Sequence, residues 1–163
     1  IKRMELFGLE LSKEKTRILP FGRYSVSRET FDFLGFTHFN SKTRKGYYTV
    51  GHKISRKKKK QFKSNLKKWV KENRTTQFDE FMKTLNKKLT GSFNYYSLSG
   101  MIKEVRNLWH HSLLLTFKWL NRRSQRRSFK LERFCEIWND RIIHPYIHVD
   151  IWSGDKVIYI KNV

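Results

Sequence analysis

Residues 100–121 run GMIKEVRNLWHHSLLLTFKWLN and carry the clearest structural pattern in the chain. The apolar side chains of this stretch recur three or four positions apart, and this spacing places them along one face of an α-helix. They are Met101, Val105, Leu108, Trp109, Leu113, Phe117 and Leu120. Because no other segment carries so long an apolar stripe, we expect this helix to form the centre of a helical core.

Two helices are expected before this one and a short helix after it. Residues 53–74 hold Ile54, Phe62, Leu66, Trp69 and Val70 at helical spacing. A second helix is expected from about 78 to 89, with Phe78, Phe81, Met82, Leu85 and Leu89 on one face. Gly91 is expected to interrupt it, because glycine is a poor helix former. The short helix contains Leu131, Phe134, Cys135 and Trp138.

Strand signals lie on both sides of these helices. Residues 31–39, FDFLGFTHF, alternate apolar and polar over most of their length, which predicts a strand. A polar turn at 41–46 and a returning strand at 47–50 complete a β-hairpin. Two short strands, 146–151 and 157–160, are expected near the end of the chain. The expected fold class is α+β, mainly α: a β-hairpin followed by a three-helix bundle and a short tail.

The charge balance limits the classes of partner. The chain has 163 residues, with 36 Lys and Arg against 14 Asp and Glu, and a net charge of +22. Such a charge favours a polyanion, and an aromatic share of 15% indicates a folded domain and not a charged tail. The single cysteine, Cys135, excludes an intrachain disulfide and a cysteine-cluster zinc site. No apolar segment is long enough to span a bilayer. Of the two polyanions that such a charge favours, nucleic acid and an anionic membrane surface, nucleic acid is the expected partner and a membrane is not.

Two basic clusters supply the candidate nucleic-acid-binding residues. The first comprises Arg56, Lys57, Lys58, Lys59, Lys60, Lys63, Lys67 and Lys68, on the helix expected over 53–74. The second comprises Arg122, Arg123, Arg126 and Arg127, whose guanidinium forks grip phosphates and stack on bases. Tyr95 and Tyr96 are candidates for stacking on unpaired bases, with packing into the core as the alternative.

No complete active site is expected in this chain. Its acidic residues are too few and too scattered for a paired-carboxylate site, and no nucleophile–base motif or phosphate-binding glycine loop is present. His144 and His148 are four residues apart, with Asp150 and Asp155 nearby, which suggests metal ligands on a helix. Pro145 argues against a helix at that point, so we predict no metal site.

Several stretches together resemble a group II intron reverse transcriptase/maturase. Residues 7–17 (FGLELSKEKTR) and 31–37 (FDFLGFT) resemble blocks of its palm. Residues 89–96 (LTGSFNYY) and 119–129 (WLNRRSQRRSF) resemble the start and the most recognisable block of its maturase-specific region. Residues 142–146 (IIHPY) resemble the ending of many bacterial members.

This resemblance, over about residues 5–146, implies a domain layout. Residues 1–52 would be the C-terminal remnant of the reverse-transcriptase palm. Residues 53–128 would be the thumb, also called domain X, and 129–163 a short helix and tail. The chain would then be either a C-terminal fragment of a full-length protein or a degenerate or split copy. Its start with Ile and not Met favours a fragment.

The resemblance also implies roles for particular residues. Lys15 falls where such polymerases place a lysine near the leaving pyrophosphate, and Phe33, Leu34 and Gly35 fall at the primer grip. The block with paired catalytic aspartates is absent, so this chain alone should not synthesise DNA. Its full-length parent would be an RNA-directed DNA polymerase that uses Mg²⁺, while no cofactor is expected in this chain.

The function implied by the resemblance is RNA binding that assists group II intron splicing and holds the primer–template duplex during reverse transcription. The expected partners are the intron RNA, an RNA–DNA or RNA duplex and a DNA target, in a bacterial cytoplasm. Two alternatives stay open. One is the thumb of a reverse transcriptase not involved in splicing, and the other is a general basic RNA-binding module.

Overall fold

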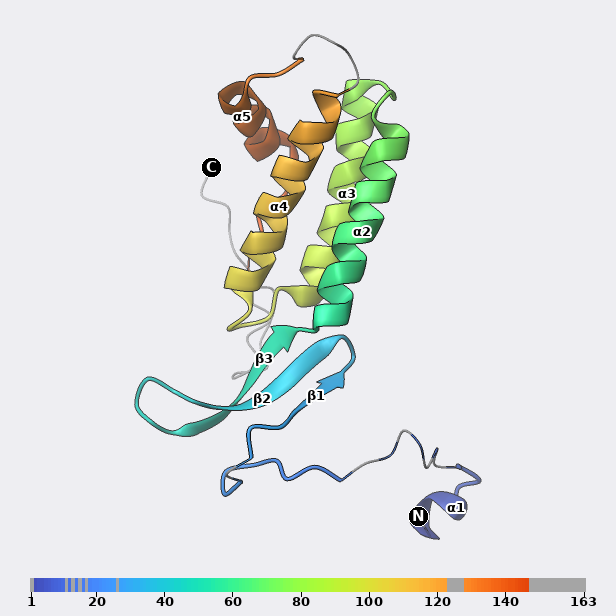
Figure 1. The fold of residues 1–163 in the computed structure, drawn as a ribbon, viewed down its shortest axis with the longest axis vertical. Helices are drawn as coiled ribbons and strands as arrows, with labels where there is room; N and C mark the ends of the chain where they lie inside the picture. Colours follow the sequence, from blue (N-terminus) through green and yellow to red (C-terminus); the bar gives the residue numbers. More distant parts are fainter. Residues whose placement is uncertain are drawn as a thin grey trace. The chain divides into compact units, whose positions relative to one another are not determined.

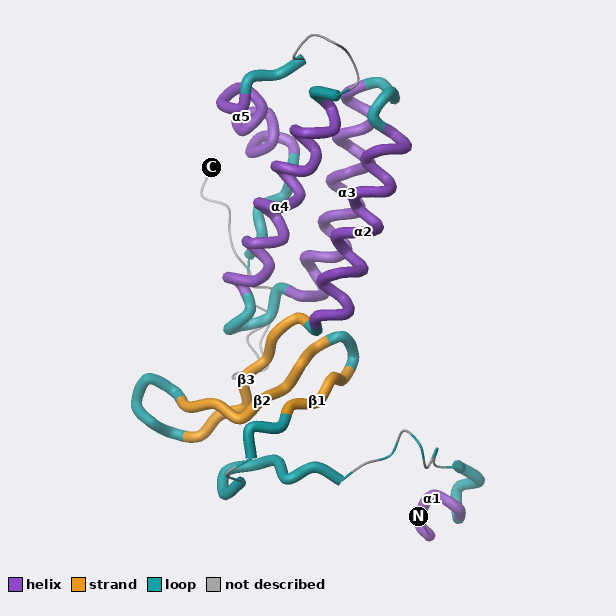
Figure 2. The backbone as a smooth tube through the Cα atoms, viewed as in Figure 1, coloured by secondary structure: helices purple, strands orange, loops and turns teal. Residues whose placement is uncertain are grey.

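The computed structural model describes residues 2–10, 12, 14, 16, 18–25, 27–122 and 128–146. Figures 1 and 2 show a mainly helical chain in which a three-stranded antiparallel sheet precedes the long helices. This arrangement confirms the α+β, mainly α fold class. The strands expected at 146–151 and 157–160 fall almost entirely outside the described residues.

The chain divides into two compact units. The first comprises Ile1–Phe31 and His38–Gly51, and the second comprises Asp32–Thr37 and His52–Val163. A four-residue helix, α1 (Lys2–Glu5), lies in the first unit. The long helices and the short segment 32–37 all lie in the second unit.

The sheet corrects one expectation about the strands. The single strand expected over 31–39 is two strands, β1 (Thr30–Phe33) and β2 (Phe36–Lys42), and the order β1-β2-β3 ends with β3 (Tyr48–Ile54). Leu34 and Gly35 form the turn between the first two, with φ of 49° and 85°. Positive φ at both central residues is what a type I′ hairpin turn requires. Alternation alone could not reveal this reversal, because the apolar residues continue on both sides of it.

Four helices build the bundle, namely α2 (Arg56–Asn73), α3 (Phe78–Tyr96), α4 (Ile102–Leu120) and α5 (Leu131–Arg141). Helix α4 packs against each of the other three, as Figure 1 allows the reader to follow. Most of the stripe expected on α4 is buried, namely Met101, Val105, Leu108, Trp109, Leu113 and Leu120, and Phe117 is partly buried. The expectation that this helix is the centre of the core is therefore confirmed.

The expectation that Gly91 interrupts the second helix is wrong. Helix α3 continues through Gly91 to Tyr96. Its last turns are held by the buried side chain of Phe93, whose carbonyl also accepts a hydrogen bond from the Ser97 N–H. Packing of this kind outweighs the roughly 1 kcal/mol that a glycine costs in a helix.

Helix α5 and the residues after it close the bundle. Phe134 and Trp138 are fully buried, and the Trp138 ring lies edge-on to Trp109 of α4. The Trp109 Nε1–H donates to the carbonyl of Ile143 at 3.1 Å, and the Ile143 N–H donates to Asn86 of α3 at 2.9 Å. Backbone polar groups after α5 are thus satisfied by both neighbouring helices.

Candidate nucleic-acid interface

Helix α2 is a basic helix whose charges do not help it to fold. Ser55 caps its start, since the Ser55 Oγ accepts from the Lys58 N–H at 3.4 Å. The first turn then carries Arg56, Lys57 and Lys58 and no acidic residue. Cations at a helix N-terminus oppose the helix dipole, where acids would stabilise it. These charges therefore point to a binding role and not to a gain in helix stability.

One lysine of the first cluster is used by the fold itself. Lys59 is half-buried, and its Nζ lies 2.9 Å from Glu104 Oε1 at the start of α4. The other carboxylate oxygen of Glu104 accepts a hydrogen bond from the Ile54 N–H at 2.8 Å. Glu104 thereby ties the end of β3 to α2 and α4, and it neutralises the Lys59 charge within the bundle.

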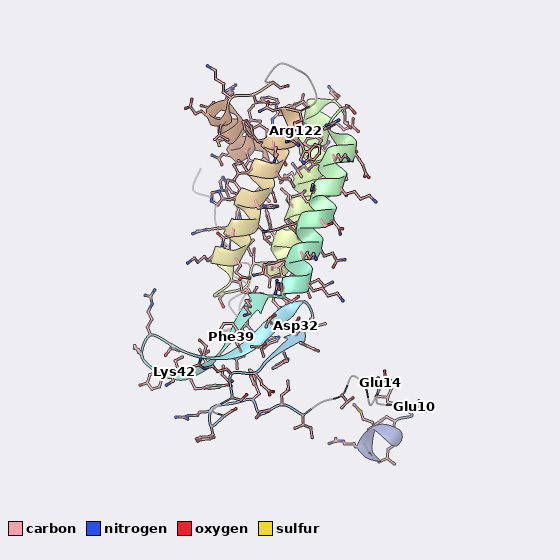
Figure 3. The ribbon with its side chains drawn as sticks, viewed as in Figure 1. Glu10, Glu14, Asp32, Phe39, Lys42 and Arg122 are labelled. Carbon is pink, nitrogen blue, oxygen red and sulfur yellow. The ribbon has the colours of Figure 1, made fainter. Side chains whose placement is uncertain are left out.

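A groove between α2 and α4 gathers cations from both helices. It is lined by Lys60, Lys63, Ser64 and Lys67 of α2 and by His111, Leu115, Lys118, Trp119 and Arg122 of α4 and its end. Five of these residues carry a permanent positive charge, and none is acidic. We call this feature the α2/α4 groove. Arg122, labelled in Figure 3, stands at the C-terminal end of α4.

Helical spacing explains why these side chains meet. Lys60, Lys63 and Lys67 are three or four residues apart on α2, and His111, Leu115, Lys118 and Arg122 repeat the same spacing on α4. Residues at such intervals share one face of a helix. Because α2 and α4 pack together, their two cationic rows border the same groove.

An aromatic ring lies among these charges. The guanidinium carbon of Arg122 is 5.4 Å from the centre of the Trp119 ring, and that of Arg74 is 5.6 Å from it. Such cation–π contacts hold both arginines in place without consuming their hydrogen-bond donors. Their N–H groups stay available for an anionic ligand.

His111 is the titratable group of the α2/α4 groove near neutral pH. Burial, and then the nearby charge of Lys63, lower the pKa of its imidazole below the ordinary value of 6.5. The ring is therefore held neutral in the free protein. A bound phosphate would reverse this effect, because a nearby negative charge favours the protonated ring.

The two tyrosines lie against the β1–β2 turn. The Tyr95 hydroxyl donates to the Leu34 carbonyl at 2.6 Å, and its ring stacks on Phe36 with centres 5.5 Å apart. Tyr96 packs edge-on to the same Phe36, and burial, followed by the neighbouring Tyr95, raises the pKa of its phenol. The Gly35 carbonyl accepts from the Ser55 N–H at 2.9 Å. These contacts anchor the turn on α3 and on the start of α2.

The same turn presents large apolar side chains to solvent. Phe33 and Leu34, two of the residues expected at the primer grip, are 60% and 67% exposed. Gly35 approaches α3 closely, since a Cβ atom at that position would lie 3.3 Å from the Tyr96 hydroxyl. The turn thus has an anchored inner side and an exposed apolar outer side.

The candidate residues fall into groups. Lys60, Lys63, Lys67 and Arg122 meet in the α2/α4 groove, and Arg56, Lys57, Lys58 and Lys68 are exposed elsewhere on α2. Four candidates lie outside the described residues, namely Lys15, Arg123, Arg126 and Arg127. Sequence reasoning missed Lys118, Trp119 and His111 as partners of the α2 lysines. Their spacing from Arg122 on the central helix was the signal that could have found them.

Two absences hold within the described part of the chain. None of its helices is long and apolar enough to cross a membrane. None of its groups of His, Cys, Asp and Glu has three or more members placed to hold a metal ion. His148, Asp150 and Asp155, considered above with His144, lie outside the described residues.

The helical bundle thus presents a groove lined by five permanent cations and by no acidic residue. Residues 59–135 match the family model for the maturase-specific domain of group II introns. This match indicates a group II intron maturase domain involved in splicing over these residues, and the resemblance to the C-terminal region of such a maturase is confirmed. The match begins in α2 and ends in α5, so it includes the α2/α4 groove. No curated protein and no solved structure matches the chain.

Proposed function

We propose that this domain binds group II intron RNA through the α2/α4 groove and thereby assists splicing. The observation that carries the proposal is the convergence of Lys60, Lys63 and Lys67 with Lys118 and Arg122 in one groove free of acids. A folded intron brings phosphates close together, and their repulsion opposes compaction. Cations fixed by a folded bundle offset that repulsion and release counterions from the RNA.

The groove chemistry supports contact with the RNA backbone more than reading of paired bases. Lysine ammonium groups meet phosphates as point charges, while Arg122 can bind one phosphate with two N–H groups. The major groove of an RNA helix is too narrow for side chains, so proteins recognise paired RNA by its shape, phosphates and 2′-hydroxyls. We expect preference for a folded RNA shape over a particular paired sequence.

A second role, holding a primer–template duplex during reverse transcription, is supported by the β1–β2 turn. Its exposed Phe33 and Leu34 side chains suit contact with the sugars of a nucleic-acid strand, and Tyr95 anchors the turn on α3. Polymerisation itself would need the Mg²⁺-binding aspartates of a full-length parent.

Two alternative functions predict different binding. A thumb that serves only reverse transcription would bind an RNA–DNA hybrid without favouring intron RNA. A general basic module would bind all structured RNAs equally.

The test compares two RNAs and a set of protein variants. Binding of the chain to a group II intron RNA from the same genome is measured over a series of salt concentrations, beside an unrelated structured RNA of equal length. We expect tighter binding to the intron RNA. Changing Lys63, Lys67 and Lys118 together to Ala should weaken it roughly tenfold or more and reduce the salt slope by about 2 to 3.

The matched control removes the same charge from another surface. Lys83, Lys87 and Lys103 are exposed lysines that do not border the α2/α4 groove, so their joint change to Ala should have a much smaller effect. Equal losses for both triple variants would mean that net charge, and not the groove, drives binding. Equal affinity for both RNAs would favour the general module.

A further inference from the structure

A second groove lies on the other side of α2, between α2 and α3. It has a cavity volume of about 430 Å³, within the range of about 300–1,000 Å³ usual for small-ligand sites. It is lined by Lys58, Gln61, Phe62, Asn65, Leu66 and Trp69 of α2 and by Lys88, Leu89, Ser92 and Tyr96 of α3. We call this feature the α2/α3 groove.

Large aromatic side chains of α2 line this groove and pack against aromatic side chains of α3. Trp69 of α2 stacks on the buried Phe81 of α3 with ring centres 5.0 Å apart, and Phe62 meets the buried Phe93 at 6.5 Å. The separation of packed helices depends on the side chains at their contact, which here include these aromatic pairs. Partly buried aromatic rings therefore border a groove that stays accessible to a planar ligand.

The polar groups of the α2/α3 groove suit a base and its phosphate. Gln61 and Asn65 are exposed, and within the described residues their side-chain amides take part in no hydrogen bond. An amide offers a donor and an acceptor side by side, the pattern needed to bind the edge of a nucleobase. Lys58 and Lys88 add two ammonium groups, and no acidic residue lines the groove.

We infer that the α2/α3 groove binds an unpaired base of the RNA, an inference that rests on the proposed function. The ring system lies against the aromatic wall formed by Phe62, Trp69 and Tyr96. The Gln61 and Asn65 amides bind its edge, and Lys58 or Lys88 contacts its phosphate. Unpaired bases in loops and bulges are the parts of an RNA that proteins stack on aromatic side chains.

The position of the two grooves on α2 explains how one strand could use both. Each residue advances about 100° around a helix, so Gln61 and Asn65 lie roughly a third of a turn around α2 from Lys60. The exposed ridge between the two grooves carries Lys57 and Lys68. A strand that crosses this ridge meets lysines along its phosphates and can turn one base into the α2/α3 groove.

A contact between Lys88 of α3 and Trp69 of α2 fits a ligand in this groove. The Lys88 ammonium lies 5.5 Å from the centre of the Trp69 ring, a cation–π contact made by an exposed, flexible side chain. A base that displaces it would gain the Trp69 ring and leave the ammonium near the phosphate of the same nucleotide.

The test uses two short RNA hairpins that differ only by one unpaired nucleotide. One hairpin is fully paired, and the other carries a single bulged 2-aminopurine in its stem. We expect the bulged hairpin to bind the chain roughly tenfold more tightly than the paired one. The fluorescence of 2-aminopurine should fall on binding, because stacking on an aromatic ring quenches it.

The variants separate the two grooves. Changing Gln61 and Asn65 together to Ala should abolish the preference for the bulged hairpin and leave affinity for the paired hairpin unchanged. The control changes Asn94 and Asn107, two exposed amides outside both grooves, and should keep the preference. A photoreactive 4-thiouridine at the bulge should cross-link to the aromatic wall, as mapped by mass spectrometry.

The outcomes distinguish this inference from the proposed function. If the paired hairpin binds through the α2/α4 groove but the bulge adds no affinity and no cross-link to the wall, the inference is wrong and the proposed function stands. A bulge preference that survives the change of Gln61 and Asn65, with cross-links to other residues, would also overturn it. If changing Lys63, Lys67 and Lys118 has no effect on either hairpin, the proposed function fails first.

Discussion

At the scale of single residues, Leu34 is notable because it is the non-glycine residue with positive φ in the described part of the chain. A side chain in this conformation costs about 1–2 kcal/mol, because its Cβ crowds the backbone. Two hydrogen bonds stabilise the turn. The Tyr95 hydroxyl donates to the Leu34 carbonyl, and the Ser55 N–H donates to the Gly35 carbonyl. The Leu34 side chain is 67% exposed, so it gains little burial in return for this strained conformation.

Changing Leu34 to Asn should stabilise the chain by about 1 kcal/mol. Asn tolerates positive φ, and Asn followed by Gly is the preferred pair for a type I′ turn. Thermal unfolding followed by circular dichroism measures the change. Gly35→Ala is the control of opposite sign, because its φ is 85° and a Cβ would crowd the Tyr96 hydroxyl. A lower melting temperature for L34N would contradict the assignment of strain to Leu34.

His111 supplies a prediction about pH. Its pKa is lowered in the folded chain, so the unfolded chain binds this proton more readily, and stability falls as the pH drops below about 6.5. RNA binding should show the opposite sign, since a phosphate near His111 favours the imidazolium. The charged groups that line the groove with this ring are Lys60, Lys63 and Lys67 of α2 and Lys118 and Arg122 of α4 and its end.

We therefore expect RNA affinity to rise as the pH falls from about 8 to about 6, and His111→Gln to remove part of this rise. Titrations of RNA binding at fixed salt measure it. His110→Gln is the matched control, because His110 is the preceding residue but borders a different surface, between α4 and α5. The same pH dependence in H111Q and in the unmodified chain would show that His111 takes up no proton on binding.

At the scale of elements, α3 shows how packing extends a helix beyond its local propensity. Phe81, Leu85, Leu89 and Phe93 are buried along one face on both sides of Gly91. Their burial fixes the helix through the glycine, and Gly91 itself is exposed. The free-energy cost of placing a glycine inside a helix is therefore still present in the folded chain.

Replacing Gly91 by Ala should raise stability by about 0.5–1 kcal/mol. Alanine is a better helix former, and nothing lies within 4 Å of its methyl group. Chemical denaturation measures the gain. Gly100→Ala provides the contrast, because Gly100 has a φ of 82° and its replacement should destabilise. A loss of stability for G91A would mean that α3 is strained at this position.

At the scale of the whole molecule, the bundle depends on α4, which packs against α2, α3 and α5. The buried stripe of α4 meets Phe134 and Trp138 of α5 and the apolar faces of α2 and α3 in one cluster. A cavity in this stripe weakens all these contacts together. The groove lysines, in contrast, are exposed and contribute little to the core.

Leu113→Ala should lower the free energy of unfolding by about 2–5 kcal/mol, the usual cost of a cavity at a buried leucine. Urea denaturation measures it. The triple change of Lys63, Lys67 and Lys118 to Ala should shift stability far less while weakening RNA binding. If the two variants lost similar stability, the weaker RNA binding of the lysine variant could not be assigned to the groove.

The periodic features of the fold could be predicted from the amino-acid sequence alone. The stripe of Leu108 and Leu113, the helix that contains Leu66 and Val70, and the short helix with Phe134 each follow from spacing along the chain. The excess of Lys and Arg over acids indicated a polyanion. The blocks around Phe33 and Tyr95 resembled the family whose maturase-specific domain matches residues 59–135.

Which side chains meet depends on tertiary packing and could not be predicted from the sequence. Periodicity defines the faces of a helix, but the partner of each face depends on how distant segments pack. Glu104 thus neutralises Lys59, while Lys118 joins Lys63 to form the groove. The reversal at Leu34 was hidden for a related reason, because a turn held by Tyr95, 61 residues away, leaves little mark on local sequence.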